Sequence, residues 1–145
     1  MPAFMKAIGE VWRCANLYRI KAYESLNINS FQDTYLIQIC NHPGITQEQL
    51  SKLIYVHKSN VARQMSSLEE KGFIYRTISK EDKRNLQVFP TQKAMDILPL
   101  ILKVSEQWNQ LLLQSLPKKE QQKFMDTLTF LATQAKTIVD HLEEE

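Results

Sequence analysis

The segment from His57 to Thr91 constrains the fold of this chain more than any other. In its first half, apolar residues recur every three or four positions, and Gly72 is a residue type that commonly ends a helix. In its second half, two runs of β-favouring residues, 73–78 and 85–89, flank the polar hexapeptide SKEDKR. The segment therefore predicts a helix over about 57–71 that leads directly into a β-hairpin.

Three further helices are predicted before this segment, at about residues 4–25, 31–41 and 45–54. Ser30 is expected to cap the second of them. In the third, Thr46 and Gln49 have the spacing of a capping box, and Leu50 and Leu53 are expected to face inward. Only a tight turn separates this third helix from the next one, so the two together predict a helix-turn-helix.

The polar face of the second helix in this pair carries side chains suited to reading DNA bases. At 100° per residue, Ser59, Arg63 and Ser67 lie opposite the apolar stripe, with Asn60 and Gln64 to one side. Arginine can donate two hydrogen bonds to guanine, and asparagine or glutamine can pair bidentately with adenine. Because every amphipathic surface helix has a polar outer face, simple exposure to solvent explains this pattern equally well.

Positive charge gathers in the same part of the chain, although the net charge is only +2. Residues 57–93 carry eight basic and four acidic side chains, whereas residues 1–56 carry five and four. Residues 94–145 carry five basic and eight acidic side chains. A polyanion would therefore meet the helix and the hairpin first, because lysine and arginine contacts to phosphates supply most non-specific affinity for DNA.

The hairpin tip presents three cations, Lys80, Lys83 and Arg84. Stability does not require cations at an exposed tip, so they indicate insertion along a phosphate backbone or into a narrow minor groove. The acidic side chains of Glu81 and Asp82 complicate this interpretation. Asp82 is either a repulsive neighbour of the phosphates or a partner of a nearby arginine that holds the loop in shape, which leaves Arg84 as the expected DNA contact.

After the hairpin, two long helices with apolar stripes are predicted. Thr91 is expected to cap the first of them, and Pro99 is expected to kink it early. The second begins at Ser115 to Pro117. Both helices are longer and more apolar than a small domain with one hairpin needs.

Residues 42–94, from HPGITQ to TQKA, resemble the DNA-binding core of the multiple-antibiotic-resistance regulator (MarR) family. The similarity is most specific in the hairpin, where the family has a basic residue, then Asp-x-Arg, then a Leu-Thr helix start. These appear here as Arg76, Asp82-Lys83-Arg84 and Pro90-Thr91. Proline in place of the usual leucine changes the entry to the next helix more than the DNA surface.

The chain departs from the family at two positions of the helix-turn-helix. Tyr55 occupies a turn position that usually holds glycine, and a left-handed residue other than glycine costs about 1 kcal/mol, so a reshaped turn is expected. His57 stands where the family usually has an aspartate or serine cap. A weaker cap leaves the start of the helix mobile until DNA phosphates engage it.

The resemblance implies a mainly α, winged helix-turn-helix fold with about six helices and a two- to three-stranded β-wing. It implies a DNA-binding domain at 31–91 and dimerisation helices at 1–30 and 92–145, which place two recognition helices about one DNA turn, ~34 Å, apart. With the residue pattern, it assigns DNA contacts to Lys58, Ser59, Asn60, Arg63, Gln64, Ser67, Arg76, Lys80, Lys83 and Arg84. Asp82 is assigned to shaping the wing, and an extended monomeric core is the alternative for the terminal helices.

Members of the family often bind small aromatic or phenolic anions between the dimer helices and the winged domain. The aromatic side chains that could line such a site here are Trp12, Tyr18, Tyr35 and Trp108. Core packing explains these four residues equally well.

Other classes of function find little support in the sequence. The histidines His42, His57 and His141 are not spaced for a catalytic triad or a metal site, so no enzyme, metal or cofactor is expected. Some family members sense peroxides through a cysteine on the first helix, but Cys14 has only Arg13 as an activating neighbour, so a packing role is expected. With no apolar run of roughly 18 residues and no signal peptide, a cytoplasmic location is expected.

The sequence therefore predicts a dimeric transcription regulator, a repressor that binds a palindromic operator in double-stranded DNA and responds to a small molecule. The alternative is a winged-helix protein-interaction module that has lost DNA binding. Arg63 and the cations of the hairpin tip favour the regulator.

Overall fold

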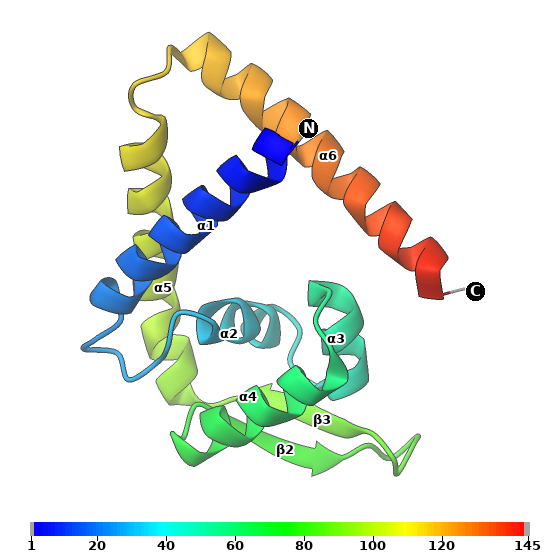
Figure 1. Ribbon diagram of the computed structural model, residues 1–145. Helices are drawn as coiled ribbons and strands as arrows, with labels where there is room; N and C mark the ends of the chain where they lie inside the picture. The colour runs from blue at the N-terminus through cyan, green and yellow to red at the C-terminus, as the bar shows by residue number, and fades with distance from the viewer. Residues whose placement is uncertain (1, 144–145) are drawn as a thin grey trace. The chain divides into compact units, whose positions relative to one another are not determined.

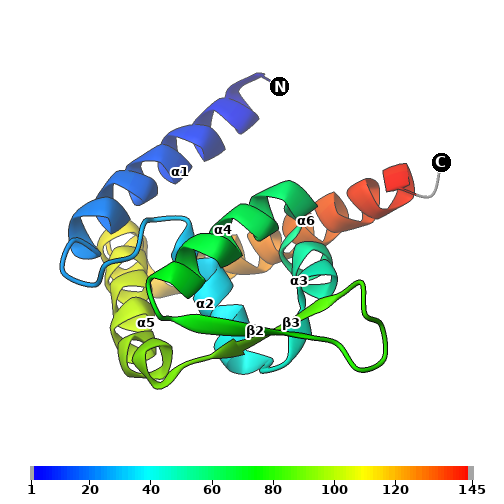
Figure 2. The same ribbon diagram turned by 90° about the horizontal axis from the view of Figure 1, so that it is seen from below.

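The computed structural model describes residues 2–143, and Figures 1 and 2 show its helices and its small sheet. The helices are α1 (Pro2–Ala22), α2 (Gln32–Asn41), α3 (Gln47–Ile54), α4 (Lys58–Glu70), α5 (Gln92–Leu113) and α6 (Lys118–Glu143). The strands β1 (Ile45–Thr46), β2 (Ile74–Ile78) and β3 (Leu86–Pro90) form an antiparallel sheet in the order β1-β3-β2. The predicted number of helices and the predicted hairpin are confirmed, and β1 completes a three-stranded sheet.

The chain divides into two compact units, Met1–Trp108 and Asn109–Glu145. The first unit contains α1 to α4, the sheet and most of α5. The second contains the last turns of α5 and the whole of α6. None of the helices that the structure describes is long and apolar enough to cross a membrane.

The core of the first unit lies among α2, α3, α4, the sheet and the start of α5. The predicted apolar stripe of α4 forms its centre, since Val61, Met65 and Leu68 are at most 1% exposed. The other fully buried large side chains of this core are Tyr23, Leu36, Ile39, Leu50, Phe73, Val88 and Ile101. Burying an apolar side chain of this size contributes about 1.5–3 kcal/mol, so α4 is held against the domain along its whole length.

Helix α3 begins with the predicted capping box. The Gln49 backbone N–H donates to Thr46 Oγ1 at 3.1 Å, and the Thr46 backbone N–H donates to Gln49 Oε1 at 3.0 Å. Leu50 is fully buried as expected, but the prediction for Leu53 is wrong, because this side chain is 42% exposed. Helix α3 has only eight residues, and Leu53 lies at the edge of its packed face, beside an open hollow that His42 also lines.

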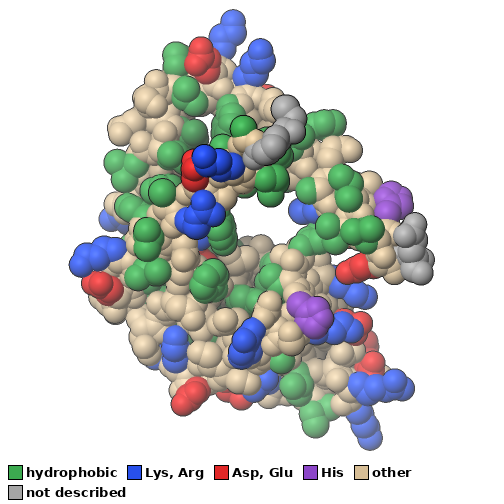
Figure 3. Space-filling model, viewed as in Figure 1, with side chains coloured by type: hydrophobic (Ala, Val, Ile, Leu, Met, Phe, Trp, Pro, Cys, Tyr) green, Lys and Arg blue, Asp and Glu red, His purple; other side chains and the backbone are tan. Residues whose placement is uncertain are grey.

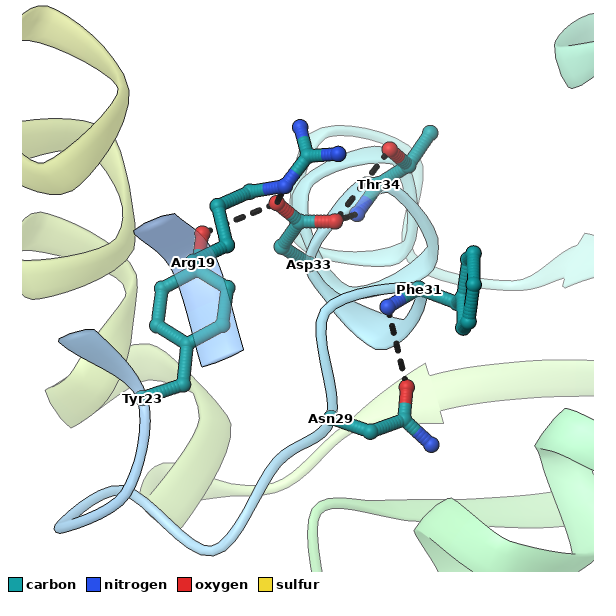
Figure 4. Close-up of polar contacts among 6 residues, drawn as sticks. All are labelled: Arg19, Tyr23, Asn29, Phe31, Asp33 and Thr34. Carbon is teal, nitrogen blue, oxygen red and sulfur yellow. Dashed lines mark hydrogen bonds and ion pairs between the residues drawn. The ribbon is translucent and has the colours of Figure 1, made fainter. Parts of the chain in front are cut away.

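The prediction that Ser30 caps α2 is wrong. The cap position is Phe31, which makes no side-chain capping bond, and Ser30 is buried. Two neighbouring amides hold this turn instead. The Phe31 N–H donates to Asn29 Oδ1 at 3.0 Å (Figure 4), and the Asn29 N–H donates to Gln32 Oε1 at 3.1 Å.

The expectation of a reshaped turn between α3 and α4 is wrong, because Tyr55 keeps the left-handed conformation there. Tyr55 adopts φ 56° and ψ 49°, and its N–H donates to the Ser51 carbonyl to end α3. At the other end of α4, Gly72 has φ +82° and its N–H donates to the Glu69 carbonyl at 3.0 Å, as expected of a helix terminator. The Tyr55 backbone costs about 1 kcal/mol that glycine would avoid.

The hairpin of β2 and β3 runs in regular register from Ile78 opposite Leu86 to Ile74 opposite Pro90. Pro90 is the last residue of β3 and so does not interrupt the ladder. Thr91 directly precedes α5, and its hydroxyl donates to the Gly72 carbonyl at 2.7 Å. This bond ties the start of α5 to the end of α4.

In the second unit, a side chain near the start of α6 bonds to the backbone at the end of α5. The Gln121 side-chain amide donates to the carbonyls of Leu113 and Leu116 at 2.9 and 2.8 Å, which satisfies groups left open at the end of α5. Helix α6 has no buried residue among those described, and its large apolar side chains are exposed, as the hydrophobic patches of Figure 3 illustrate.

Candidate nucleic-acid interface

Helix α4 begins at a histidine cap. His57 Nδ1 accepts from the Ser59 backbone N–H at 3.2 Å and lies 2.7 Å from Ser59 Oγ. An imidazole nitrogen therefore replaces the carboxylate or hydroxyl oxygen that usually satisfies an orphan N–H at this position. The expected cap at His57 is confirmed, and Ser59 helps to hold it.

Part of the predicted base-reading set lies together on the outer surface of α4. Its exposed members are Lys58, Ser59, Asn60 and Arg63. The Arg63 guanidinium donates to Asn60 Oδ1, which orients its fork along the helix surface. Lys58 Nζ lies 3.8 Å from Glu48 Oε1 but stays 71% exposed. These side chains are free of the core and lie along the first two turns of α4.

Gln64 and Ser67, two other predicted contacts, are placed differently. Both are only partly exposed and turn toward α2. The Gln32 amide donates to Gln64 Oε1 at 3.2 Å and to Ser67 Oγ at 2.9 Å. The structure therefore does not bring these two side chains to the same exposed face as Arg63.

Arg76 lies at the base of the wing rather than at its surface, and its side chain is only 19% exposed. Its guanidinium donates to both carboxylate oxygens of Glu69, at 3.1 and 3.3 Å, and to Gln47 Oε1 at 3.1 Å. These bonds join β2 to α4 and α3. They also hold the pKa of Glu69 below its ordinary value, because hydrogen bonds from Arg76 stabilise the carboxylate.

The Arg76–Glu69 pair predicts a pH dependence of stability. A lowered pKa in the folded state contributes stability that is present above the ordinary glutamate pKa of about 4.3 and is lost as the pH falls through the lowered value. We expect Glu69→Gln to be less stable than the wild type in urea unfolding at pH 7, and the difference to shrink below about pH 4. A difference that stays constant down to pH 3 would contradict this role for the pair.

The wing tip is organised around Asp82. Its Oδ1 accepts from the Arg84 backbone N–H at 3.0 Å, its Oδ2 accepts from the Asn85 side-chain amide at 3.2 Å, and its carbonyl accepts from the Asn85 N–H at 3.0 Å. The expected partner was an arginine side chain, and the observed partner is the arginine backbone. The guanidinium of Arg84 is therefore not used to hold the loop.

The cations of the wing tip are exposed. Lys80, Lys83 and Arg84 all lie on the surface, where blue side chains gather at the tip in Figure 3. A hollow of about 310 Å³ separates the wing from α4, and Lys58, Ala62 and Arg84 are among its lining residues. The first turn of α4 and the wing therefore face one concave surface with a cation on each side.

The candidate effector residues are spread over the first unit. Tyr18 and Trp108 have ring centroids 5.2 Å apart, and Arg19 lies 4.7 Å above the exposed ring of Trp12. Tyr35 is instead a buried core residue of α2, and burial raises the pKa of its hydroxyl. The structure thus brings Tyr18 and Trp108 together and places Tyr35 in the core.

The two cysteines of the described chain lie on different helices, Cys14 on α1 and Cys40 on α2. Cys14 is exposed, whereas Cys40 is partly buried, which raises the pKa of its thiol. Among residues 2–143, no three His, Cys, Asp or Glu side chains converge as metal ligands.

Sequence reasoning missed three side chains that belong to this surface or support it. Ser66 is exposed beside Arg63. Gln32 is fully buried and contacts α4, and Glu69 holds Arg76. The helical spacing of Ser66 was a usable signal, whereas the other two roles depend on contacts between distant segments.

Comparison with known proteins identifies the family. The family model "MarR family" matches residues 26–86. The Bacillus subtilis (strain 168) protein YybA, described as an uncharacterized HTH-type transcriptional regulator, is 28% identical over 122 residues, which cover 84% of this chain and 81% of YybA.

Solved structures extend the similarity to nearly the whole chain. The crystal structure of MarR is 30% identical, with a TM-score of 0.85 over 92% of this chain and 91% of that one. A Listeria monocytogenes protein assigned to the MarR family, solved in complex with a 26mer DNA, is 27% identical, with a TM-score of 0.84 over 92% and 89%. The predicted winged helix-turn-helix fold is confirmed by these likenesses. The chain belongs to the MarR family.

Proposed function

We propose that this protein is a transcription regulator that binds double-stranded DNA in a sequence-specific way. The observation that carries the proposal is the shared surface of α4 and the wing, where Lys58 and Arg84 line one hollow and Arg63 lies exposed nearby. Cations there can neutralise phosphates while the outer side chains of α4 reach base edges in the major groove. The DNA complex of the Listeria relative supports this assignment.

A salt titration of binding to duplex DNA tests the proposal. Each phosphate contact should steepen the slope of log K against log [salt] by about −0.9, and the operator should bind more tightly than a scrambled duplex at every salt concentration. The operator itself would come from a selection of bound genomic fragments. No binding to any duplex at low salt would support the alternative, a winged-helix module that binds protein.

We further propose that residues 31–91 form the DNA-binding domain and that residues 1–30 and 92–145 supply dimerisation helices. Large apolar side chains support this, because they are exposed on α1 and α6 without a covering partner in the single chain. On these helices they include Phe4, Ile8, Val11, Phe124, Leu128 and Leu131. Exposed apolar faces of this kind mark interaction surfaces.

Sedimentation at micromolar concentration should therefore give a homodimer near twice the 17.0 kDa chain mass. A dimer with two-fold symmetry presents two recognition helices and so fits a palindromic operator. A strict monomer would remove the two-half-site arrangement, because one winged domain can contact only half of a palindrome.

The sign of regulation and the effector are further parts of the proposal. We propose that the protein is a cytoplasmic repressor and not an enzyme. A repressor acts by covering its operator, which requires neither catalysis nor a cofactor.

A small aromatic or phenolic anion is the proposed effector, with the Tyr18–Trp108 pair and Trp12 as candidate walls of its binding site. Tryptophan fluorescence during a titration with phenolic acids, run beside DNA release, tests this: quenching without release would exclude regulation by those ligands.

A further inference from the structure

Gln32 is a buried polar residue that belongs to α2 but contacts the recognition helix α4. Its side chain is fully buried. The amide nitrogen donates to Gln64 Oε1 at 3.2 Å and to Ser67 Oγ at 2.9 Å. The amide oxygen accepts from Lys71 Nζ at 2.9 Å and from the Asn29 backbone N–H at 3.1 Å. All four hydrogen-bonding positions of the amide are therefore occupied.

Gln32 contacts two residues of α4 and the residue that caps its end, and all three lie on one side of the helix. Gln64, Ser67 and Lys71 are separated by three and four positions, so they follow one another along successive turns. Hydrogen bonds to three successive turns resist rotation of α4 about its axis as well as sliding along it. The apolar stripe alone is less directional, because apolar contacts tolerate small rotations that hydrogen bonds do not.

We propose that Gln32 is a positioning residue for DNA recognition: it fixes the rotation of α4, so that sequence discrimination depends on an α2 side chain that DNA cannot touch. The inference rests on the proposed function, because it concerns how α4 presents Arg63 and its exposed neighbours to base edges. It also assigns Gln64 and Ser67 to holding the helix rather than to reading bases.

The next residue in the chain provides a matched comparison. Asp33 points away from α4 toward α1, where the Tyr23 hydroxyl donates to its Oδ2 at 2.8 Å and Arg19 Nε lies 3.8 Å away (Figure 4). Tyr23→Phe therefore removes one buried hydrogen bond from the same turn of α2 without altering a contact to α4. It is the control for a general loss of stability.

The experiment compares the ratio of affinities for the selected operator and a scrambled duplex in the full-length wild type and three variants. Gln32→Leu keeps the volume but removes all four bonds, and its ratio should fall about tenfold, the size of one lost base-pair preference. Gln32→Glu should keep the ratio within about twofold, since a carboxylate accepts from Lys71, from the Ser67 hydroxyl and from a turned Gln64 amide. Tyr23→Phe should leave the ratio unchanged while lowering the melting temperature.

An unchanged ratio in folded Gln32→Leu, or an equal fall in Tyr23→Phe, would overturn the proposal. If Gln32→Leu does not fold, Ser67→Ala decides, because it removes a single bond. A positioning Ser67 should lose discrimination over the whole half-site, and a base-reading Ser67 should lose it at one base pair.

Failure of the proposed function would look different from failure of this inference. If the wild type enriches no duplex from the selection, the protein is not a sequence-specific DNA binder and the ratio has no meaning. If the wild type discriminates and folded Gln32→Leu discriminates equally well, DNA binding stands and the positioning role of Gln32 is wrong.

Discussion

Arg63→Ala is expected to weaken binding to the operator by about 1–3 kcal/mol for each half-site in which Arg63 contacts a base, which is about 2–6 kcal/mol for a dimer that uses both. The guanidinium is exposed on α4, and Asn60 orients it from one turn earlier. An arginine in this position can donate two hydrogen bonds to guanine, and alanine can donate none. The measurement is the affinity for the operator and for single-base variants of it.

Two control variants separate base reading from charge. Arg63→Lys keeps the positive charge but loses the planar fork, so it should retain non-specific binding and lose discrimination. Lys119→Ala removes an exposed cation of α6 that is not among the proposed DNA contacts, and it should change neither as long as sedimentation shows the same oligomeric state as the wild type. If Arg63→Ala lowered affinity equally for all sequences, Arg63 would be a phosphate clamp.

The sequence predicted those parts of the fold in which local chemistry decides the structure. The capping box of Thr46 and Gln49 and the cap position at His57 each depend on a few neighbouring residues, and both were predicted. The apolar stripe of α4 could also be predicted, because its apolar residues recur with the period of an α-helix. The prediction that Leu53 faces inward was wrong, because the packing of neighbouring elements decides where the buried face of α3 ends. The helical period of apolar residues does not contain this information.

The outer face of α4 could be predicted only in part. On a helical wheel, Ser66 and Ser67 lie at nearly equal angles on opposite sides of the centre of the polar face. The structure separates them, since Ser66 is exposed whereas Ser67 bonds to Gln32. The side on which α2 packs is a tertiary property, and Gln32 lies 35 residues from Ser67.

The basic residues illustrate the same limit. Arg76 and Arg84 look alike in sequence, and both fit the family's wing pattern. The carboxylate of Glu69, seven residues away, occupies Arg76, whereas Asp82 accepts from the backbone of Arg84 and leaves its guanidinium available. Whether a cation in such a motif is structural or available for phosphate therefore depends on where the nearest carboxylate points.

The wing offers the second large effect. Arg84→Ala should weaken operator binding and flatten the salt slope by about 0.9 for each lost phosphate contact, or about 1.8 for a dimer that loses two. Folding should be nearly unchanged, because the hydrogen bonds that shape the loop come from the Arg84 backbone and not from its side chain. Thermal unfolding of the same sample checks this, and a large loss of stability would mean that Arg84 has a structural role.

Asp82 separates loop shape from charge. Asp82→Ala removes the acceptors for the Arg84 N–H and the Asn85 amide, so the tip should lose its order and binding should weaken even though a repulsive charge is gone. Asp82→Asn keeps an oxygen for the Arg84 N–H and removes only the charge, so it should bind as tightly as the wild type or slightly more tightly. Asp82→Ala should have no further effect on binding in a protein that already carries Arg84→Ala, because the only proposed role of the loop shape is to position the Arg84 side chain. If Asp82→Ala and Asp82→Asn tightened binding equally, the carboxylate would act only by repelling phosphates, and the hydrogen bonds around it would not control how the wing meets DNA.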